Sequence, residues 1–204
     1  MSHPQWDAVY KERVEIGELI DHVYSHKAYL TEIIGRSPRS VLEVGVGGGS
    51  TSIFLTYLGI KVTAIDNNAS VIKSAARNNA RLGGKLEFRE ADAFRLPYPN
   101  DSFDLICHQG FFEHFEDGDI RSLAREQLRV APAVVFSVPT RYYLSRALGE
   151  RLLTKRRWEA IVSPFRIGAS FYYGRPRPDG VRKRLLTAAG WRDIYYCCVL
   201  TRDA

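Results

Sequence analysis

Three glycines at alternating positions follow a short apolar segment of the chain. Gly45, Gly47 and Gly49 come directly after residues 41–44, and the carboxylate of Glu43 lies two positions before the first glycine. Glycine adopts positive φ angles and lets the backbone approach a ligand without a Cβ in the way. The helical spacing that follows directs free N–H groups to the same point. The segment therefore predicts a strand, a ligand-binding turn and a helix.

Two further carboxylates follow the next two predicted strands. Asp66 ends the apolar segment 60–66, 17 residues after Gly49. A carboxylate at that place accepts hydrogen bonds from both hydroxyls of a ribose in nucleotide-binding α/β folds. Asp92 lies in the loop after the third predicted strand, residues 85–90. The glycine turn and Asp66 thus both indicate a nucleotide-like ligand.

With these features, residues 40–138 resemble the class I S-adenosylmethionine-dependent methyltransferases. The resemblance implies that Glu43 positions the methionine end of S-adenosylmethionine, that Asp66 holds its ribose and that Asp92 accepts a hydrogen bond from its adenine. It also implies a backbone N–H contact to the adenine from Ala93, with Asn67 beside the ring. The expected cofactor-binding residues are Glu43, Gly45, Gly47, Gly49, Asp66, Asn67, Asp92, Ala93 and Gln109.

A dinucleotide-dependent dehydrogenase is the nearest alternative, because its G-x-G-x-x-G fingerprint also follows a first strand. It fits less well, since Ser50 occupies the sixth position counted from Gly45. The acidic Glu43 would also repel a pyrophosphate. A P-loop is excluded because no Gly-Lys-Ser/Thr follows the glycines.

The loop after the fourth predicted strand carries the candidate acid and base. Residues 107–115 read CHQGFFEHF and lack the Pro-Pro and Pro-Cys motifs of nucleic-acid-directed members of the family. The stretch FFEHFED instead resembles the small-molecule branch, which implies that Glu113 and His114 lie near the cofactor or substrate. Methyl transfer to a hydroxyl or a protonated amine requires the removal of one proton, and histidine titrates near neutral pH. Glu113 and His114 are therefore the catalytic candidates, with a hydrogen-bonded structural ring as the alternative for His114.

The remaining histidines give no indication of a metal site. His108 lies within an apolar strand and is expected in the core or behind the site. His22 and His26 are four residues apart on a predicted helix, but no third ligand is near them in the sequence. We therefore expect no metal.

Aromatic and basic residues gather around and after the fifth predicted strand, residues 133–138. Aromatic rings there would line a substrate pocket or attract a cationic sulfonium, and arginine would face a carboxylate or phosphate. Residues packed against the rest of the chain are the structural alternative. The expected substrate contacts are Phe112, Arg141, Tyr142 and Tyr143.

These residues need a scaffold, and the spacing of apolar residues predicts an α/β fold. Strands alternate with helices, which indicates a parallel sheet with right-handed crossovers. Strands are expected at 40–45, 60–66, 85–90, 103–107, 133–138, 169–173 and 191–201, and helices within 6–34 and at 50–58, 69–82, 120–129, 144–162 and 181–189. With the resemblance, this predicts a Rossmann-like, doubly wound, mostly parallel seven-stranded sheet with helices on both faces.

The 204 residues suit one domain, residues 1–204. Residues 1–38 are expected to form an N-terminal helical cap, and residues 139–180 a lid inserted after the fifth strand. The last sheet edge is left open, because residues 169–173 compete with the final strand for the antiparallel position.

Composition narrows the class of protein further. No apolar run approaches the ~18 residues of a membrane helix, and the polar start MSHPQWDAVYKER is unlike a signal peptide. We therefore expect a soluble, cytoplasmic protein that does not act in a membrane. The three cysteines Cys107, Cys197 and Cys198 lack ligand spacing and are expected to be reduced.

The basic residues are concentrated in the last third of the chain. Of the 29 basic and 23 acidic side chains, residues 141–204 hold 14 and 5, which gives that part a net charge of +9. The main hypothesis is a methyltransferase that modifies O or N of a small-molecule acceptor. A second hypothesis, which we favour less, uses the basic third to bind RNA or protein. A third is a nucleotide-binding protein without catalysis. The sequence does not define the acceptor or the oligomeric state.

Overall fold

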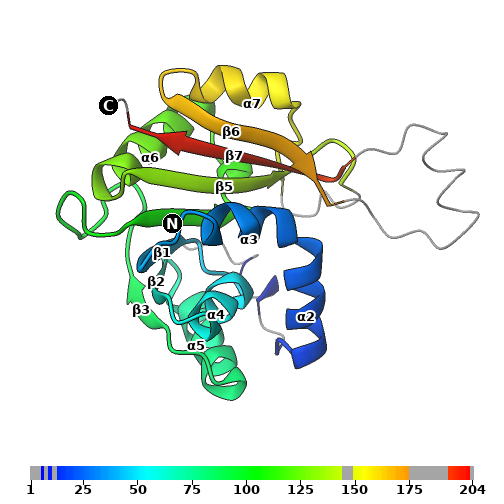
Figure 1. Ribbon diagram of the computed structural model, residues 1–204, viewed down its shortest axis with the longest axis vertical. Coiled ribbons are helices and arrows are strands. Elements are labelled where there is room, and N and C mark those ends of the chain that lie inside the picture. The colour runs from blue at the N-terminus through cyan, green and yellow to red at the C-terminus, as the bar shows by residue number, and fades with distance from the viewer. Residues whose placement is uncertain (1–5, 7–8, 11–12, 144–148, 175–192, 203–204) are drawn as a thin grey trace, which may run out of the picture.

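The computed structural model describes residues 6, 9–10, 13–143, 149–174 and 193–202. Within them, seven strands form one sheet in the order β3-β2-β1-β4-β5-β7-β6 (Figure 1). The strands are β1 (Ser40–Val44), β2 (Lys61–Asp66), β3 (Glu87–Glu90), β4 (Leu105–Gln109), β5 (Ala133–Pro139), β6 (Arg166–Tyr173) and β7 (Tyr195–Thr201). The first five strands run parallel, and β7 pairs antiparallel with both β5 and β6. The predicted fold class is confirmed.

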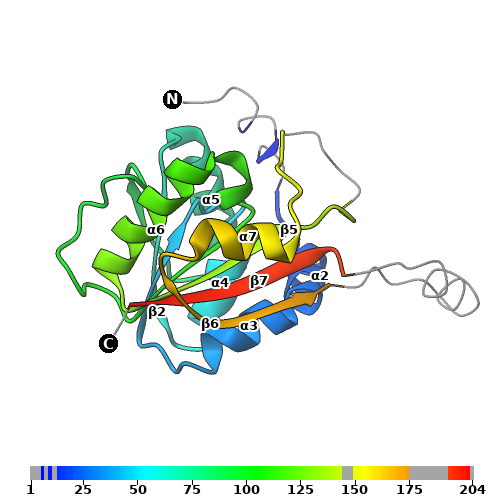
Figure 2. The same ribbon diagram turned by 90° about the horizontal axis from the view of Figure 1, so that it is seen from above.

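The helices cover both faces of this sheet. They are α2 (Ile16–Ser25), α3 (Lys27–Ile34), α4 (Ser50–Tyr57), α5 (Ala69–Leu82), α6 (Asp117–Val130) and α7 (Lys155–Val162), with a short 3₁₀ turn η1 (Phe112–His114). Figure 2 shows α6 and α7 on one side of the sheet and α3 and α4 on the other. Each side holds its own buried apolar cluster, which is the layered arrangement that an α/β chain needs. None of the described helices has the length and apolar character that crossing a bilayer requires.

Local sequence explains several helix boundaries. Asn68 accepts hydrogen bonds from Ser70 N and Val71 N at the start of α5, and Gly83 ends the helix with φ of 70°. Side-chain caps and a left-handed glycine satisfy the terminal backbone groups that a helix cannot pair internally.

Strand β5 shows that both faces of the sheet are covered by apolar core. Every one of its residues is buried, as expected for a central strand covered on both sides. The adjacent Cys197 and Cys198 of β7 belong to opposite apolar clusters, because successive strand residues point to opposite faces. All three cysteines are free.

The segment after β5 differs from the prediction. A helix over 144–162 is wrong in its first part, because residues 149–154 are not helical and Thr154 caps α7 by accepting from Arg157 N at 3.3 Å. Helix α7 buries Trp158 in the core, and β6 forms the antiparallel sheet edge. Residues 155–173 of the segment 139–180 thus belong to the sheet and its covering layer, and the lid over 139–180 stays a prediction. The helix predicted at 181–189 lies outside the described residues.

Candidate functional site

A cavity of about 460 Å³ lies at the carboxyl ends of β1 and β4. These strands are neighbours in the sheet, yet β1 leads to β2 on one side and β4 leads to β5 on the other. Ligands bind at this kind of switch point in open α/β sheets. The cavity is also large enough for a small molecule. The fold therefore places a cavity where the sequence puts its glycine turn.

The glycine turn forms one wall of this cavity. Gly45, Gly47 and Gly49 have φ angles of 72°, 51° and 84°, which side chains with a Cβ rarely adopt. A Cβ on Gly47 would lie 2.9 Å from the ring of Tyr10, and a Cβ on Gly45 would lie 2.9 Å from the ring of Phe111. Glycine is thus required at Gly45 and Gly47 for both backbone angle and space.

Glu43 lies beside this turn at the inner end of the cavity. Its side chain is buried and accepts a hydrogen bond from the hydroxyl of Ser52 on α4. Burial raises the pKa of Glu43 from 4.5 to about 8, despite the opposing effect of Ser52. A buried carboxyl without a cationic partner is costly, so a positively charged ligand group next to it would be stabilised.

The predicted ribose and adenine contacts lie outside the residues that line the cavity. Asp66 ends β2, and its Oδ1 accepts from Asn68 N at 3.0 Å. Burial raises the pKa of Asp66 to about 6. Asn67 and Asp92 are exposed and Ala93 is half-buried. These four residues lie at the carboxyl ends of β2 and β3, on the same edge of the sheet as the cavity. Their cofactor contacts stay predictions.

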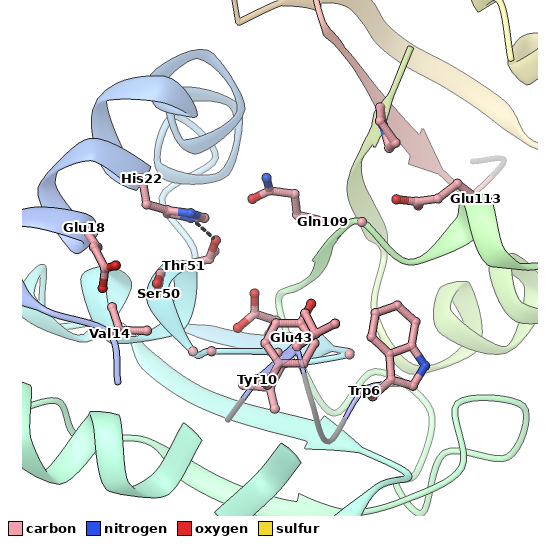
Figure 3. A pocket seen from close by; sticks show the side chains of 18 of the residues that line it. Trp6, Tyr10, Val14, Glu18, His22, Glu43, Ser50, Thr51, Gln109 and Glu113 are labelled. Atoms are coloured by element: carbon pink, nitrogen blue, oxygen red, sulfur yellow. Dashed lines mark hydrogen bonds between the residues drawn. The ribbon is translucent and has the colours of Figure 1, made fainter. Parts of the chain in front are cut away.

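Gln109 reaches into the cavity from the last position of β4 (Figure 3). Its Nε2 lies 2.8 Å from Nε2 of His26, a buried residue between α2 and α3. The hydroxyl of Tyr173 lies 3.0 Å from His26 Nδ1 and 2.5 Å from the hydroxyl of Ser137. This buried chain of hydrogen bonds fixes the Gln109 side chain. Burial lowers the pKa of His26 to about 3, so the ring is neutral.

Glu113 and His114 both line the cavity, as the sequence predicts for an acid and base pair. Glu113 is only 2% exposed, and burial raises its pKa to about 8. Its Oε1 lies 3.9 Å from His114 Nε2, and its Oε2 has no hydrogen-bond partner among the described residues. The His114 ring packs edge-on against Trp6 at 4.9 Å between centroids. Glu113 is thus in a state that favours holding a proton at neutral pH.

The predicted substrate contacts are only partly brought together. Tyr143 lines the cavity. Phe112 does not, because it is fully buried in the core against His108 and Phe136, and we correct the prediction that it contacts a substrate. Arg141 is exposed and its guanidinium stacks on the ring of Tyr142, 4.9 Å from the centroid. Neither of these two residues lines the cavity in this structure.

Several lining residues are absent from the sequence prediction. Trp6 and Tyr10 come from the N-terminal segment, which the sequence assigns only to a helical cap, and Tyr195 begins β7. His22 also lines the cavity, and its Nε2 is 2.9 Å from the hydroxyl of Thr51. Aromatic residues in an otherwise polar opening segment are the one signal that could have indicated Trp6 and Tyr10.

Several basic residues of the last third have structural partners. Arg151 donates to Asp117 at 2.7 Å, and Arg157 pairs with the same carboxylate. Arg202 pairs with Asp101. These ion pairs tie α7 and the chain end to the body of the domain. Within the described part of the chain, no cluster of three or more His, Cys, Asp or Glu residues could hold a metal ion.

Comparison with known proteins shows to which family the chain is related. A family model described as a methyltransferase domain matches residues 41–132. A ubiquinone biosynthesis O-methyltransferase from a Caulobacter species is 30% identical over 197 residues, which covers 83% of this chain and 75% of that protein. Ajmaline N-methyltransferase from Rauvolfia serpentina is 27% identical over 146 residues, or 62% of this chain. This chain covers 50% of that relative's length and 39% of a demethylmenaquinone methyltransferase from Deinococcus radiodurans.

Solved structures with low sequence identity share the fold. A protein from Pyrococcus horikoshii matches with a TM-score of 0.76 at 16% identity and covers 99% of this chain and 100% of its own. Magnesium protoporphyrin IX methyltransferase from Synechocystis, solved with bound S-adenosylmethionine, matches with a TM-score of 0.68 at 13% identity, covering 98% of this chain and 90% of its own. The sheet order, the glycine turn and the relative from Caulobacter together define the class of protein. The chain belongs to the class I S-adenosylmethionine-dependent methyltransferase family.

Proposed function

We propose that this protein transfers a methyl group from S-adenosylmethionine to an oxygen or nitrogen atom of a small-molecule acceptor. The observation that carries the proposal is the convergence of Glu43, the glycine turn and the Glu113–His114 pair on one cavity at the switch point of the sheet. The N- and O-methyltransferases among its relatives support the same chemistry.

The residues present fit the cofactor. Gly45 and Gly47 line the cavity with positive φ angles and no Cβ, which suits the close approach of a ligand to the backbone. Glu43 offers a buried carboxyl whose pKa burial raises to about 8, so a positively charged group of the cofactor beside it would be stabilised. Asp66, at the end of β2, is the candidate for the ribose hydroxyls, and Asp92 with Ala93 for the adenine. When bound, S-adenosylmethionine supplies a methyl group on a positively charged sulfur.

The chain itself must then orient the acceptor and accept its proton. An in-line displacement depends chiefly on alignment, which the rigid ends of β1 and β4 provide. Glu113 and His114 are placed to remove the proton of a hydroxyl or an ammonium group. Trp6 and Tyr10 cover the cavity from the N-terminal side and reduce the access of water (Figure 3).

We propose the cytoplasm as the place of action.

Titration calorimetry with S-adenosylhomocysteine, the demethylated product, tests the cofactor half of this proposal. Asp66→Ala should weaken binding roughly 10- to 150-fold, because a carboxylate that accepts from two buried hydroxyls is lost. Asp119→Ala, at an exposed position of α6, is the matched control and should bind normally. An Asp66→Ala affinity within twofold of wild type would contradict the ribose assignment. Binding of NAD in place of S-adenosylhomocysteine would overturn the proposal.

A further inference from the structure

The cavity wall is acidic, although the whole chain carries a net charge of +6. Its described lining has four carboxyl side chains and one guanidinium. These are Glu18, Glu43, Glu113, Glu150 and Arg13. Burial raises the pKa of Glu43 and of Glu113 to about 8, so both are mostly protonated at pH 7 in the empty cavity, and a bound cation would favour their charged forms. A bound molecule with positive charge is therefore the better electrostatic match.

Two of these carboxyl groups lie beyond the glycine turn, on the side of β4 and η1. Glu150 contributes to the raised pKa of Glu113, and both side chains line the cavity. Glu113 is 2% exposed and its Oε2 has no hydrogen-bond partner among the described residues. An unpaired buried carboxyl is expensive to maintain, so its presence indicates a ligand group that pairs with it.

Aromatic rings stand next to this carboxyl. The rings of Tyr143 and Tyr195 both line the cavity, with centroids 5.7 Å apart. Tyr195 stacks on Tyr173 at 5.4 Å with an interplanar angle of 28°, which holds its ring in place. Glu113 and Tyr195 line the same cavity, so the carboxyl and this ring face one space. Ring faces attract cations, and more strongly when water is excluded.

Gln109 adds a neutral acceptor to the same cavity. Its Nε2 is bonded to His26, and its Oε1 is buried without a partner among the described residues. Figure 3 shows the side chains of Gln109 and Glu113 reaching into the cavity from β4 and η1. An ammonium group carries several N–H donors, whereas an ether or carboxylate carries none. Two unsatisfied acceptors beside aromatic rings therefore match an amine.

We propose that Gln109, Glu113, Tyr143 and Tyr195 form an acceptor subsite for a small amine, which enters as the ammonium cation and is methylated on nitrogen. This reassigns Gln109 from the cofactor, for which the sequence predicts it, to the acceptor. This inference rests on the proposed function, because it names the substrate class of the same cavity. The ammonium passes one proton to the Glu113 carboxylate, which leaves the nitrogen with a free electron pair. That pair would form the new N–C bond to the methyl group while the methyl–sulfur bond breaks and its electrons stay on sulfur. The Glu113 carboxyl returns that proton to solvent after the product leaves.

Binding experiments on the protein saturated with S-adenosylhomocysteine test the subsite separately from catalysis. The protein must first bind S-adenosylhomocysteine to saturation. If it does not, the proposed function fails before any amine is added. The probes are benzylamine, phenethylamine and tryptamine, each paired with the alcohol that replaces its amino group. We expect at least one amine to bind roughly tenfold or more tightly than its alcohol, as a charge-assisted hydrogen bond predicts. Equal binding, or no binding, in all three pairs would overturn the inference while leaving the proposed function intact.

Variants test which residues cause the preference for the amine over its alcohol. Glu113→Gln keeps the shape of the side chain and should reduce the preference for the amine to less than about threefold. Glu116→Gln, three residues further along, is the matched control because its carboxyl is 83% exposed, and it should keep the preference. Tyr143→Leu should weaken the amine more than the alcohol. A preference that survives in Glu113→Gln would overturn the role of this carboxyl.

Proton release gives a readout that a merely structural role of Glu113 would not affect. At pH 7 the free carboxyl is mostly protonated, since its pKa is about 8. Binding of an ammonium ion should then release up to about one proton, measured as the difference in binding heat between phosphate and Tris buffers at the same pH. In Glu113→Gln this difference should vanish. An unchanged proton release in the variant would contradict the proposed proton transfer.

Discussion

Replacement of Glu43 by glutamine should make the ligand-free protein more stable, and increasingly so as the pH rises. The pKa of this buried carboxyl is about 8 in the folded chain, against 4.5 for an ordinary glutamate. Below pH 4.5 the group is protonated in both the folded and the unfolded chain, so it adds no difference in free energy. Above that pH the unfolded chain loses the proton first, and the folded state is progressively disfavoured until pH ~8.

The size of the stability change follows from the difference between the two pKa values of Glu43. Each pH unit between the two pKa values costs the folded state about 1.4 kcal/mol, which gives about 3 kcal/mol at pH 7 and less than about 1 kcal/mol at pH 5. Glutamine keeps an oxygen that accepts from Ser52 but carries no charge. The variant should therefore melt roughly 6–12 °C higher than wild type at pH 7 and within about 3 °C of it at pH 5.

Thermal unfolding followed by circular dichroism at both pH values measures this. Glu116→Gln is the control, because removing an exposed carboxyl relieves no burial penalty and should change stability by less than about 0.5 kcal/mol. The same Glu43→Gln variant should bind S-adenosylmethionine more weakly, since the charge that opposes folding is the one that meets the cofactor. A gain in stability that is equal at pH 5 and pH 7, or a loss at pH 7, would refute the reasoning.

Further predictions concern the glycine turn and the buried hydrogen bonds. Gly47→Ala should weaken S-adenosylhomocysteine binding at least tenfold in calorimetry, because the new Cβ would meet the Tyr10 ring at 2.9 Å and the backbone has φ of 51°. Gly59→Ala, at φ of 78° with nothing within 4 Å, should cost about 1 kcal/mol of stability and leave binding unchanged, so equal affinities of the two variants would disprove the steric argument. Tyr173→Phe removes the hydroxyl that joins Ser137 to His26 and should lower the unfolding free energy by about 1–2 kcal/mol in urea titrations, whereas unchanged stability would show that this chain of hydrogen bonds contributes nothing.

Much of the fold is predictable because burial on both faces leaves a local pattern. The runs at β1 and β5 are mostly apolar, and the structure buries β5 completely. The end of the sheet was harder to predict, because β6 has mostly half-buried and exposed residues and its antiparallel pairing with β7 joins segments far apart in sequence. The predicted helix over 144–162 began too early. The sequence alone does not show that Thr154 has the extended backbone of a cap and that the helix begins at Lys155.

The site, too, has residues that the sequence could predict and residues that it could not. Glu43 and the glycine turn were predictable because their function depends on residue types within a few positions of one another. Phe112 and Glu113 are neighbours in one 3₁₀ turn, yet one belongs to the core and the other to the cavity, and the sequence does not define the rotation of that turn. Trp6 and Tyr195 reach the cavity through tertiary contacts alone, which no local pattern records.

The span of the cavity along the chain has a consequence for how ligands act on the whole molecule. Its wall draws on residues from Trp6 near the amino end to Tyr195 in the last strand. No smaller part of the domain can form the complete site, so binding is linked to global rather than local unfolding. A ligand at a hundredfold excess over its dissociation constant adds about 2.7 kcal/mol to the stability of the native state. The melting temperature of the intact domain is therefore a direct gauge of cavity occupancy and can be used to screen for the acceptor without any assay of methyl transfer.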